Sequence, residues 1–332
     1  MDSGATWHDD SAMTVPEVRA PAEADRLIGP LREAGGDSLR AILLFGSQLV
    51  RATPDDHSAW DVVLVVDSYK AFHRQLVSGG HHRRPAWLLS LLAGVLPPNI
   101  TAFDPGDDGP LAKCAIVSRE HFRRALGPRA PDHFLKGRMV QKVAVLWARD
   151  GAARAEVEEA LAGARRGVLS WVAPYLEGDF DAADLARRML EVSYGGELRP
   201  ESGDRVAQVY GAHDAFLRGA LEDVLARAEE AGEVTPTGQG RFRVAREPGR
   251  WERWRVSLYF ARSKARATAR WLKHVVTFND WLTYIQRKVE RRLGTEVEIT
   301  PWERRLPLLL LWPKVVRVLR LRRASSPSGD DE

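Results

Sequence analysis

The stretch AILLFGSQLVRATPDDHSAWDVVLVVD, residues 41–67, contains two apolar runs of strand length joined by a polar loop. The first run ends in Gly46-Ser47, and the second begins with the isolated acid Asp61. Short apolar runs that are rich in branched residues and bounded by turn residues are typical of buried β-strands. We therefore predict strands over 38–46 and 61–66, with a glycine, a serine and an aspartate at the ends that the polar loop connects.

The rest of the chain predicts a small sheet followed by helices. Two further strands are expected over 99–105 and 111–118, and a short helix is expected after Ser118, a suitable N-cap. Helices are expected over 21–34 and 68–95, the latter with Phe72, Leu76, Trp87, Leu88, Leu91 and Leu92 available for a core. From residue 131 the pattern predicts mainly helices, over 153–177, 182–192 and 204–231, and a turn or hairpin over 232–244. Strands first and helices later favour an α+β fold with a mixed sheet and a helical region.

Composition divides the chain into five segments. The ends lack apolar periodicity and are expected to be disordered tails. Between them we predict a sheet-containing domain, a helical domain and a basic, aromatic-rich region. The expected bounds are 1–15, 16–150, 151–245, 246–323 and 324–332.

Bulk composition excludes several classes of protein. Hydrophobic residues make up 44% of the 332 residues, which is enough to bury a core. The single cysteine, Cys114, excludes an internal disulfide framework and is expected to be a small buried apolar side chain. The N-terminal residues lack the basic and apolar parts of a signal peptide, and no apolar run reaches the length of a membrane span. We therefore expect a cytoplasmic protein.

Gly46, Ser47 and Asp61 together favour phosphate chemistry. A glycine lets a phosphate approach the backbone, a serine hydroxyl adds a donor, and an acid on the neighbouring strand can carry Mg²⁺. Gly-Ser, 13 residues and then Asp-Val-Val resembles the nucleotidyltransferase signature, although the second acid of that signature falls on Val63. The alternative is an ordinary strand end and a turn-capping aspartate.

Four blocks in order extend this resemblance over about residues 40–200. They are FGSQLV…WDVVLVVD, AKCAIVS, KGRMVQK and YGGELR. Together they resemble the peripheral phosphatidate cytidylyltransferases of the mitochondrial translocator assembly and maintenance type. That family has a Tyr-Gly-Ser, a single strand aspartate, a Lys-Tyr-Gly-Val-Ile-Ser strand, a Gly-Arg-(Leu/Met)-x-Lys-Pro stretch and a Tyr-x-Gly-Asp-(Ile/Phe)-Arg motif. Because the family also lacks the second strand acid, Val63 agrees with it.

The resemblance implies roles for two groups of residues. Gly46 and Ser47 match the phosphate-binding Gly-Ser, and Asp61 matches the aspartate that holds Mg²⁺. Glu197 stands where the family has Asp, as a second metal ligand with a longer side chain, and Arg199 matches a phosphate-binding arginine. The alternative for Glu197 is a turn or surface carboxylate.

The KGRMVQK block, residues 136–142, matches the family less closely. Arg138 matches the family arginine, whereas the family lysine falls on Gln141, one position before Lys142. Arg138 and Lys142 are expected to bind phosphates, or else to be solvated residues beside an apolar segment. Asp104 is either an additional acid for the metal or a residue that caps a turn.

The C-terminal part is strongly basic although the net charge of the chain is only +4. Residues 251–323 contain 18 Lys/Arg and 6 Asp/Glu, so the remainder carries a charge of −8. Tryptophans and Leu308–Leu311 stand among these cations, a composition suited to an anionic membrane surface. One alternative is that Leu308–Leu311 pack into the helical domain. RNA is another, but Pro307 and Pro313 interrupt a groove-reading helix and argue against nucleic acid.

The resemblance implies a Mg²⁺-dependent enzyme of phospholipid biosynthesis. Its substrates are CTP and phosphatidic acid, its products are CDP-diacylglycerol and pyrophosphate, and it acts at the inner face of the membrane. Three alternatives stay open. They are a nucleotidyltransferase for a soluble small molecule or protein, one for RNA, and a non-catalytic protein that binds nucleotide or lipid.

Overall fold

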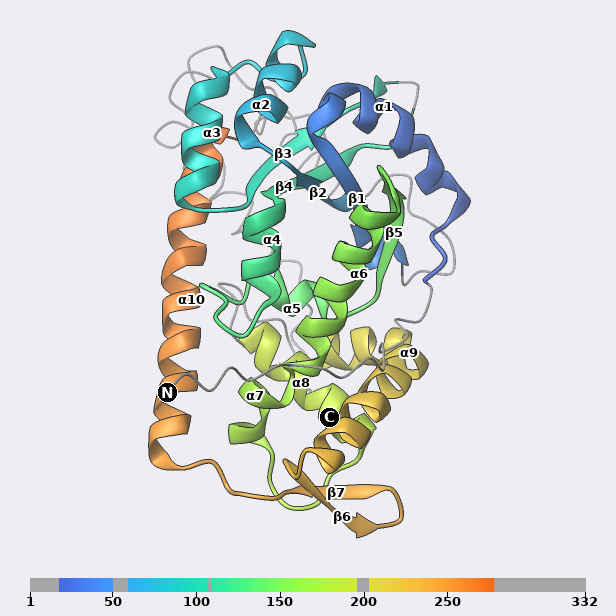
Figure 1. Ribbon diagram of the computed structural model, residues 1–332, viewed down its shortest axis with the longest axis vertical. Helices are drawn as coiled ribbons and strands as arrows, with labels where there is room; N and C mark the ends of the chain where they lie inside the picture. Colours follow the sequence, from blue (N-terminus) through green and yellow to red (C-terminus); the bar gives the residue numbers. More distant parts are fainter. Residues whose placement is uncertain (1–17, 50–58, 107–108, 196–202, 278–332) are drawn as a thin grey trace, which may run out of the picture. The chain divides into compact units, whose positions relative to one another are not determined.

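The computed structural model describes residues 18–49, 59–106, 109–195 and 203–277. All of them belong to the first of two compact units, residues 1–277, and the second unit, 278–332, lies outside the described residues. Glu197, Arg199, Leu308–Leu311 and both expected tails also lie outside them. Figure 1 labels the elements α1 (Asp25–Gly35), β1 (Leu39–Phe45), β2 (Trp60–Val66), α2 (Tyr69–Ser78), α3 (Ala86–Val95), β3 (Asn99–Phe103), β4 (Ala112–Ser118), α4 (Arg119–Leu126), α5 (Lys136–Met139), β5 (Val143–Ala148), α6 (Gly151–Arg166), α7 (Leu169–Val172), α8 (Ala182–Gly195), α9 (Gly203–Glu230), β6 (Val234–Gly238), β7 (Arg241–Val244) and α10 (Arg250–Thr277). A short 3-10 helix, η3 (Ser47–Leu49), lies between β1 and β2.

Five strands form a mixed sheet in the order β3-β4-β2-β1-β5. Strands β2 and β4 are parallel, and the other neighbouring pairs are antiparallel. The four strands expected from the sequence are present, and Ser118 caps α4 by accepting a hydrogen bond from His121 N at 3.3 Å. The chain is therefore an α+β protein whose sheet precedes a helical region.

The expectation of mainly helices after residue 131 was wrong for Val143–Ala148. This run forms the edge strand β5, which pairs with β1, and the helix before it, α5, has only four residues. A short apolar run fits a strand and a buried helix turn equally well in sequence. Pairing with β1, which lies about a hundred residues earlier in the chain, decides between them.

Helices cover both faces of the sheet (Figure 1). One face packs alternate strand residues against α1 and α2, in a core that includes Leu44, Val62 and Cys114 with Leu27 and Phe72. The intervening residues of each strand face the other side, where α4 and α6 contribute buried apolar residues. This second set of strand residues includes the positions of Asp61 and Lys113, so both side chains lie on the face that carries α4 and α6.

The helical region contains α6 to α9 and a β6–β7 hairpin, which confirms the hairpin expected over 232–244. Helix α10 then joins this region to the sheet. Near its start Arg253 Nη1 donates to Pro174 O at 3.3 Å, and near its end Lys273 Nζ donates to Asn99 Oδ1 at 2.8 Å. Between these points Asp132 Oδ2 accepts hydrogen bonds from Arg266 and Arg270, each at 2.7 Å. One helix thus contacts elements that are far apart in the sequence.

Helix α3 differs from the expectation in one respect. Its Leu89 and Ala93 are buried, but Trp87 and Leu91, which we expected in the core, are 67% and 56% exposed. A ten-residue helix that is apolar on nearly all sides has more apolar surface than one contact face can bury. Within the described ranges, no helix has both the length and the apolar character of a transmembrane segment.

Candidate active site

Three residues that the sequence predicted for the site, Gly46, Ser47 and Asp61, meet at one edge of the sheet. Strand β1 ends at Phe45, which pairs with Asp61 of β2 on one side and with Val143 of β5 on the other. Because β2 and β4 run in parallel, Asp61 also lies beside Lys113. We call Gly46, Ser47, Asp61 and Lys113 the Gly46 edge.

Gly46 turns the chain out of β1 directly against Asp61. Its φ is +84°, a region that L side chains rarely adopt. A Cβ at this position would stand 3.1 Å from Asp61 Oδ2. Ser47 then begins the short helix η3, which the hydrogen bond from Leu49 N to Gly46 O (3.1 Å) closes. A glycine is therefore needed here both for the backbone conformation and for the space beside the carboxylate.

Asp61 and Lys113 form a partly exposed ion pair. Lys113 Nζ lies 3.7 Å from Asp61 Oδ1, and the side chains are 42% and 33% exposed. A pair this open to water adds little to stability. Lysine is also an unusual choice inside a strand whose neighbours Ala112 and Cys114 are fully buried. The pair is thus better suited to chemistry at the edge than to holding the fold together.

The sequence prediction gave Lys113 no role. It stands in the AKCAIVS block, and a lone lysine in an apolar strand was the available signal. What the sequence did not contain is the register of β2 against β4, which puts this lysine beside Asp61.

Lys142 lies close to the Gly46 edge, whereas Arg138 faces elsewhere. Lys142 directly precedes Val143, the partner of Phe45. Arg138 Nη1 donates to Phe134 O at 2.7 Å, and its guanidinium carbon lies 4.2 Å from the centre of the Phe134 ring. The structure thus places Lys142 at the start of β5 beside the turn after β1, and orients Arg138 toward Phe134.

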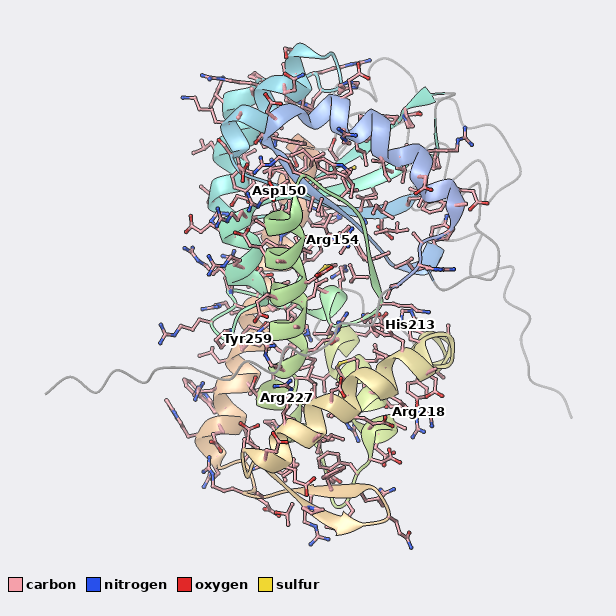
Figure 2. All side chains as sticks on the ribbon, turned by 45° about the vertical axis from the view of Figure 1, so that its right-hand side comes forward. Asp150, Arg154, His213, Arg218, Arg227 and Tyr259 are labelled. Atoms are coloured by element: carbon pink, nitrogen blue, oxygen red, sulfur yellow. The ribbon has the colours of Figure 1, made fainter. Side chains whose placement is uncertain are left out.

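A basic cluster lies next to the Gly46 edge and consists of Lys142, Arg165 and His213. The sequence indicated only Lys142. Arg165 at the end of α6 is 1% exposed and donates to Gln141 O at 3.3 Å, but its Nε and Nη1 have no hydrogen-bond partner among the described residues. Burial lowers the pKa of Arg165 to about 10. His213 of α9, labelled in Figure 2, is 3% exposed, and within the described part of the chain its Nδ1 likewise has no hydrogen-bond partner. Burial, and then the charge of Lys142, lower the pKa of His213 to about 4.

This basic cluster is an unusual way to fill a protein interior. A buried guanidinium with unsatisfied N–H groups is costly. Arg165 offsets part of this cost by lying over the Phe216 ring, with its guanidinium carbon 5.1 Å from the ring centre. Tyr194, one residue before the end of α8, donates from its hydroxyl to Gln141 Oε1 at 3.4 Å. Tyr194 is the first residue of the YGGELR block, so this block begins beside the residues that precede β5.

The structure also shows the surroundings of Asp104 and Cys114, two further residues that the sequence analysis named. Asp104 is exposed and accepts a hydrogen bond from Gly106 N at 3.0 Å, as expected for a residue that caps a turn. Cys114 is completely buried, as expected, and burial raises the pKa of its thiol. Across the described ranges, no three His, Cys, Asp or Glu side chains gather as a metal-binding group. The roles of Glu197 and Arg199 stay predictions.

No protein-family model matches the chain, and no curated protein matches it. A partly exposed carboxylate, a neighbouring ammonium group and a glycine turn are together suited to bind a phosphate chain that carries a divalent cation.

Proposed function

We propose that the chain is a nucleotidyltransferase that transfers the cytidylyl group of CTP to phosphatidic acid. The observation that carries the proposal is the close contact of Gly46 with Asp61 at the edge of a mixed sheet. The resemblance of four blocks between about residues 40 and 200 supports a nucleotidyltransferase-like fold, CTP as the donor and phosphatidic acid as the acceptor.

The donor groups at the Gly46 edge fit Mg²⁺. Mg²⁺ is usually held by one or two carboxylates, several waters and the phosphates of the substrate, so a single partly exposed aspartate is a sufficient anchor. Asp61 would hold the ion, with Glu197 as the second carboxylate in the proposed site. When bound, Mg²⁺ neutralises the charge that develops on the phosphate oxygens during transfer.

The residues of this chain then bind and orient the reacting groups. In the proposed complex the backbone of Gly46 and the hydroxyl of Ser47 bind the β- and γ-phosphates. Lys113 turns from Asp61 toward the phosphate chain, and Lys142 and Arg199 bind phosphates of CTP or of the lipid. Arg138 would join them only after its guanidinium leaves Phe134. The buried charge of Arg165 raises the positive potential behind Lys142.

The transfer itself needs no strong general base. An ionised oxygen of the lipid phosphate attacks the α-phosphorus of CTP, and the bond from that phosphorus to the bridging oxygen breaks. Pyrophosphate leaves with the electron pair of that bond, and CDP-diacylglycerol is formed. Because the attacking oxygen carries no proton at neutral pH, the protein has to position it in line rather than deprotonate it.

A lipid acceptor also requires access to a membrane. The basic, aromatic-rich region 246–323 is suited to contact an anionic surface, at about 1 kcal/mol for each Lys or Arg near the lipid. We therefore propose that the protein associates peripherally with the inner face of the membrane.

The test incubates the full chain with Mg²⁺, each of the four α-labelled nucleoside triphosphates and phosphatidic acid vesicles. We expect label from CTP to enter the lipid, and Asp61→Asn to abolish this while CTP binding weakens only in the presence of Mg²⁺. Asp67→Asn is the matched control, because Asp67 follows the opposite end of β2 and pairs with Arg40 and Arg149. Asp104→Asn in the same assay decides whether that acid completes the metal site.

The alternatives give different results in the same experiment. If the label enters RNA, a protein or a small soluble molecule, that molecule is the acceptor in place of the lipid, and the proposed nucleotide site still stands. Binding of CTP without turnover under every acceptor would favour a non-catalytic protein. Full turnover by Asp61→Asn would show that Asp61 is not the Mg²⁺ ligand.

A further inference from the structure

Helix α3 exposes three large apolar side chains in a row. Trp87, Leu91 and Val95 follow at intervals of four residues, so they share one face of the helix. They are 67%, 56% and 70% exposed. Single exposed apolar residues are common, but a contiguous apolar patch on a surface indicates that something covers it. We call these three residues the α3 stripe.

The α3 stripe is held outward by the packing of the opposite side of the helix. Leu89 and Ala93 are buried beneath it, and Asn99 Nδ2 donates to Leu89 O at 2.8 Å. Just after the helix, Lys273 Nζ of α10 donates to Pro98 O at 2.8 Å. Rotation of α3 to bury the stripe would break these contacts, so the apolar surface belongs to the folded protein.

The segment that carries the α3 stripe has charged side chains of one sign only. Residues 68–103 contain no aspartate or glutamate. The same segment contains four Lys/Arg, and every one of them is exposed, namely Lys70, Arg74, Arg83 and Arg84. This segment therefore combines an apolar stripe with exposed cations and contributes no acidic side chain to the surface.

We propose that the α3 stripe and these four cations dock the protein on an anionic lipid bilayer. Tryptophan, leucine and valine can enter the boundary between headgroups and acyl chains, while arginine and lysine remain at the level of the headgroups. A second copy of the chain fits less well, because a symmetric dimer through this face would bring the same cations together. A nucleic acid would match the charge but would leave the apolar stripe uncovered.

This docking does not depend on the proposed enzymatic function. It assigns membrane contact to a helix of the sheet-containing part, in addition to the basic region 246–323. Its test can therefore succeed even where no lipid is cytidylylated, and it can fail where the enzyme is active.

The first experiment measures binding of the full chain to vesicles of phosphatidylcholine, alone or mixed with phosphatidylserine. Phosphatidylserine provides the charge without being the proposed substrate. We expect binding to the mixed vesicles, and a loss of about tenfold or more for Leu91→Glu, because a charge replaces an apolar side chain at the interface. Ala226→Glu, at an exposed position of α9, adds the same charge elsewhere and should bind as wild type. Both substitutions lie at exposed positions, and an unchanged unfolding midpoint verifies the fold. Unchanged binding by Leu91→Glu would overturn the proposal.

The second experiment locates the contact. Cys114 is 0% exposed, so a cysteine introduced by Leu91→Cys is the one that reacts with an environment-sensitive dye. We expect the dye at position 91 to shift to the blue with mixed vesicles and to be quenched by a lipid-borne quencher, and the dye on Ala226→Cys to do neither. No shift at position 91 in vesicle-bound protein would refute the proposal. A shift without vesicles that grows with protein concentration, together with a doubled mass, would also refute it, because the face would then join two copies of the chain.

Discussion

Replacement of Gly46 by alanine probes the feature on which the proposed site depends. Two costs apply at this position. The backbone has φ +84°, and the new Cβ would stand 3.1 Å from Asp61 Oδ2. Gly80, after α2, has a similar φ of +77°, but a Cβ there has no other atom within 4 Å. Gly46→Ala and Gly80→Ala therefore share the backbone cost and differ in the contact with the carboxylate.

The backbone cost follows from the positive φ. An L side chain in this region costs about 1–2 kcal/mol, and the reduced freedom of the unfolded chain returns about 0.4–1 kcal/mol. From this backbone effect alone, both variants should thus lose about 0–1.6 kcal/mol of unfolding free energy. In Gly46→Ala alone, the carboxylate of Asp61 must also move by a few tenths of an ångström. Because misplacement of a reacting group by about 1 Å can cost 10²-fold in rate, we expect a loss of about tenfold in turnover.

The assay combines urea unfolding with transfer of label from CTP to lipid. We expect both variants to lose stability, Gly46→Ala at least as much as Gly80→Ala because of the added contact with Asp61, and a loss of turnover in Gly46→Ala only. Wild-type turnover by Gly46→Ala would refute the reasoning, since the space beside Asp61 would then be irrelevant to the reaction. Equal losses of turnover in both variants would refute it too, because general destabilisation would account for them.

Three further predictions concern charged groups. Lys113→Met should change the unfolding free energy by less than about 1 kcal/mol, because the pair of Lys113 with Asp61 is partly exposed. The same variant should bind CTP about tenfold more weakly in titration calorimetry. CTP binding equal to wild type would exclude Lys113 from the site. Arg165→Met should leave the unfolding free energy unchanged or raise it by about 1–3 kcal/mol, since two unsatisfied buried N–H groups disappear; a loss of more than about 2 kcal/mol in urea unfolding would show that Arg165 stabilises the fold. His213 has a folded pKa of about 4 against 6.5 unfolded, so its contribution is fully present above pH 6.5 and is lost as the pH falls toward 4, with a slope of about 1.4 kcal/mol per pH unit. Urea unfolding between pH 7.5 and 5 should therefore show a flatter pH dependence for His213→Gln, and an unchanged slope would contradict the neutral state of the buried ring.

The sequence predicted the strands that carry a strong local pattern and missed the one that does not. Residues 39–45 and 60–66 are branched apolar runs bounded by turn residues, and they form β1 and β2. Val143–Ala148 has a similar composition but follows a short helical turn, and only the pairing with β1 makes it a strand. The same limit applies to α3, whose apolar residues predicted burial although one face of the helix has no neighbour in the described structure.

The residues of the candidate site also fall into those that the local sequence predicts and those that long-range contacts decide. By itself, the sequence determined that a glycine, a serine and an aspartate end two neighbouring strands, because strand ends and turn residues are local properties of the chain. Only the tertiary structure decided that Lys113 lies beside Asp61, and that Arg165 and His213 are buried near Lys142 without acidic partners among the described residues. Those contacts depend on strand register and helix packing, which arise from interactions between residues far apart in the chain and leave no local pattern.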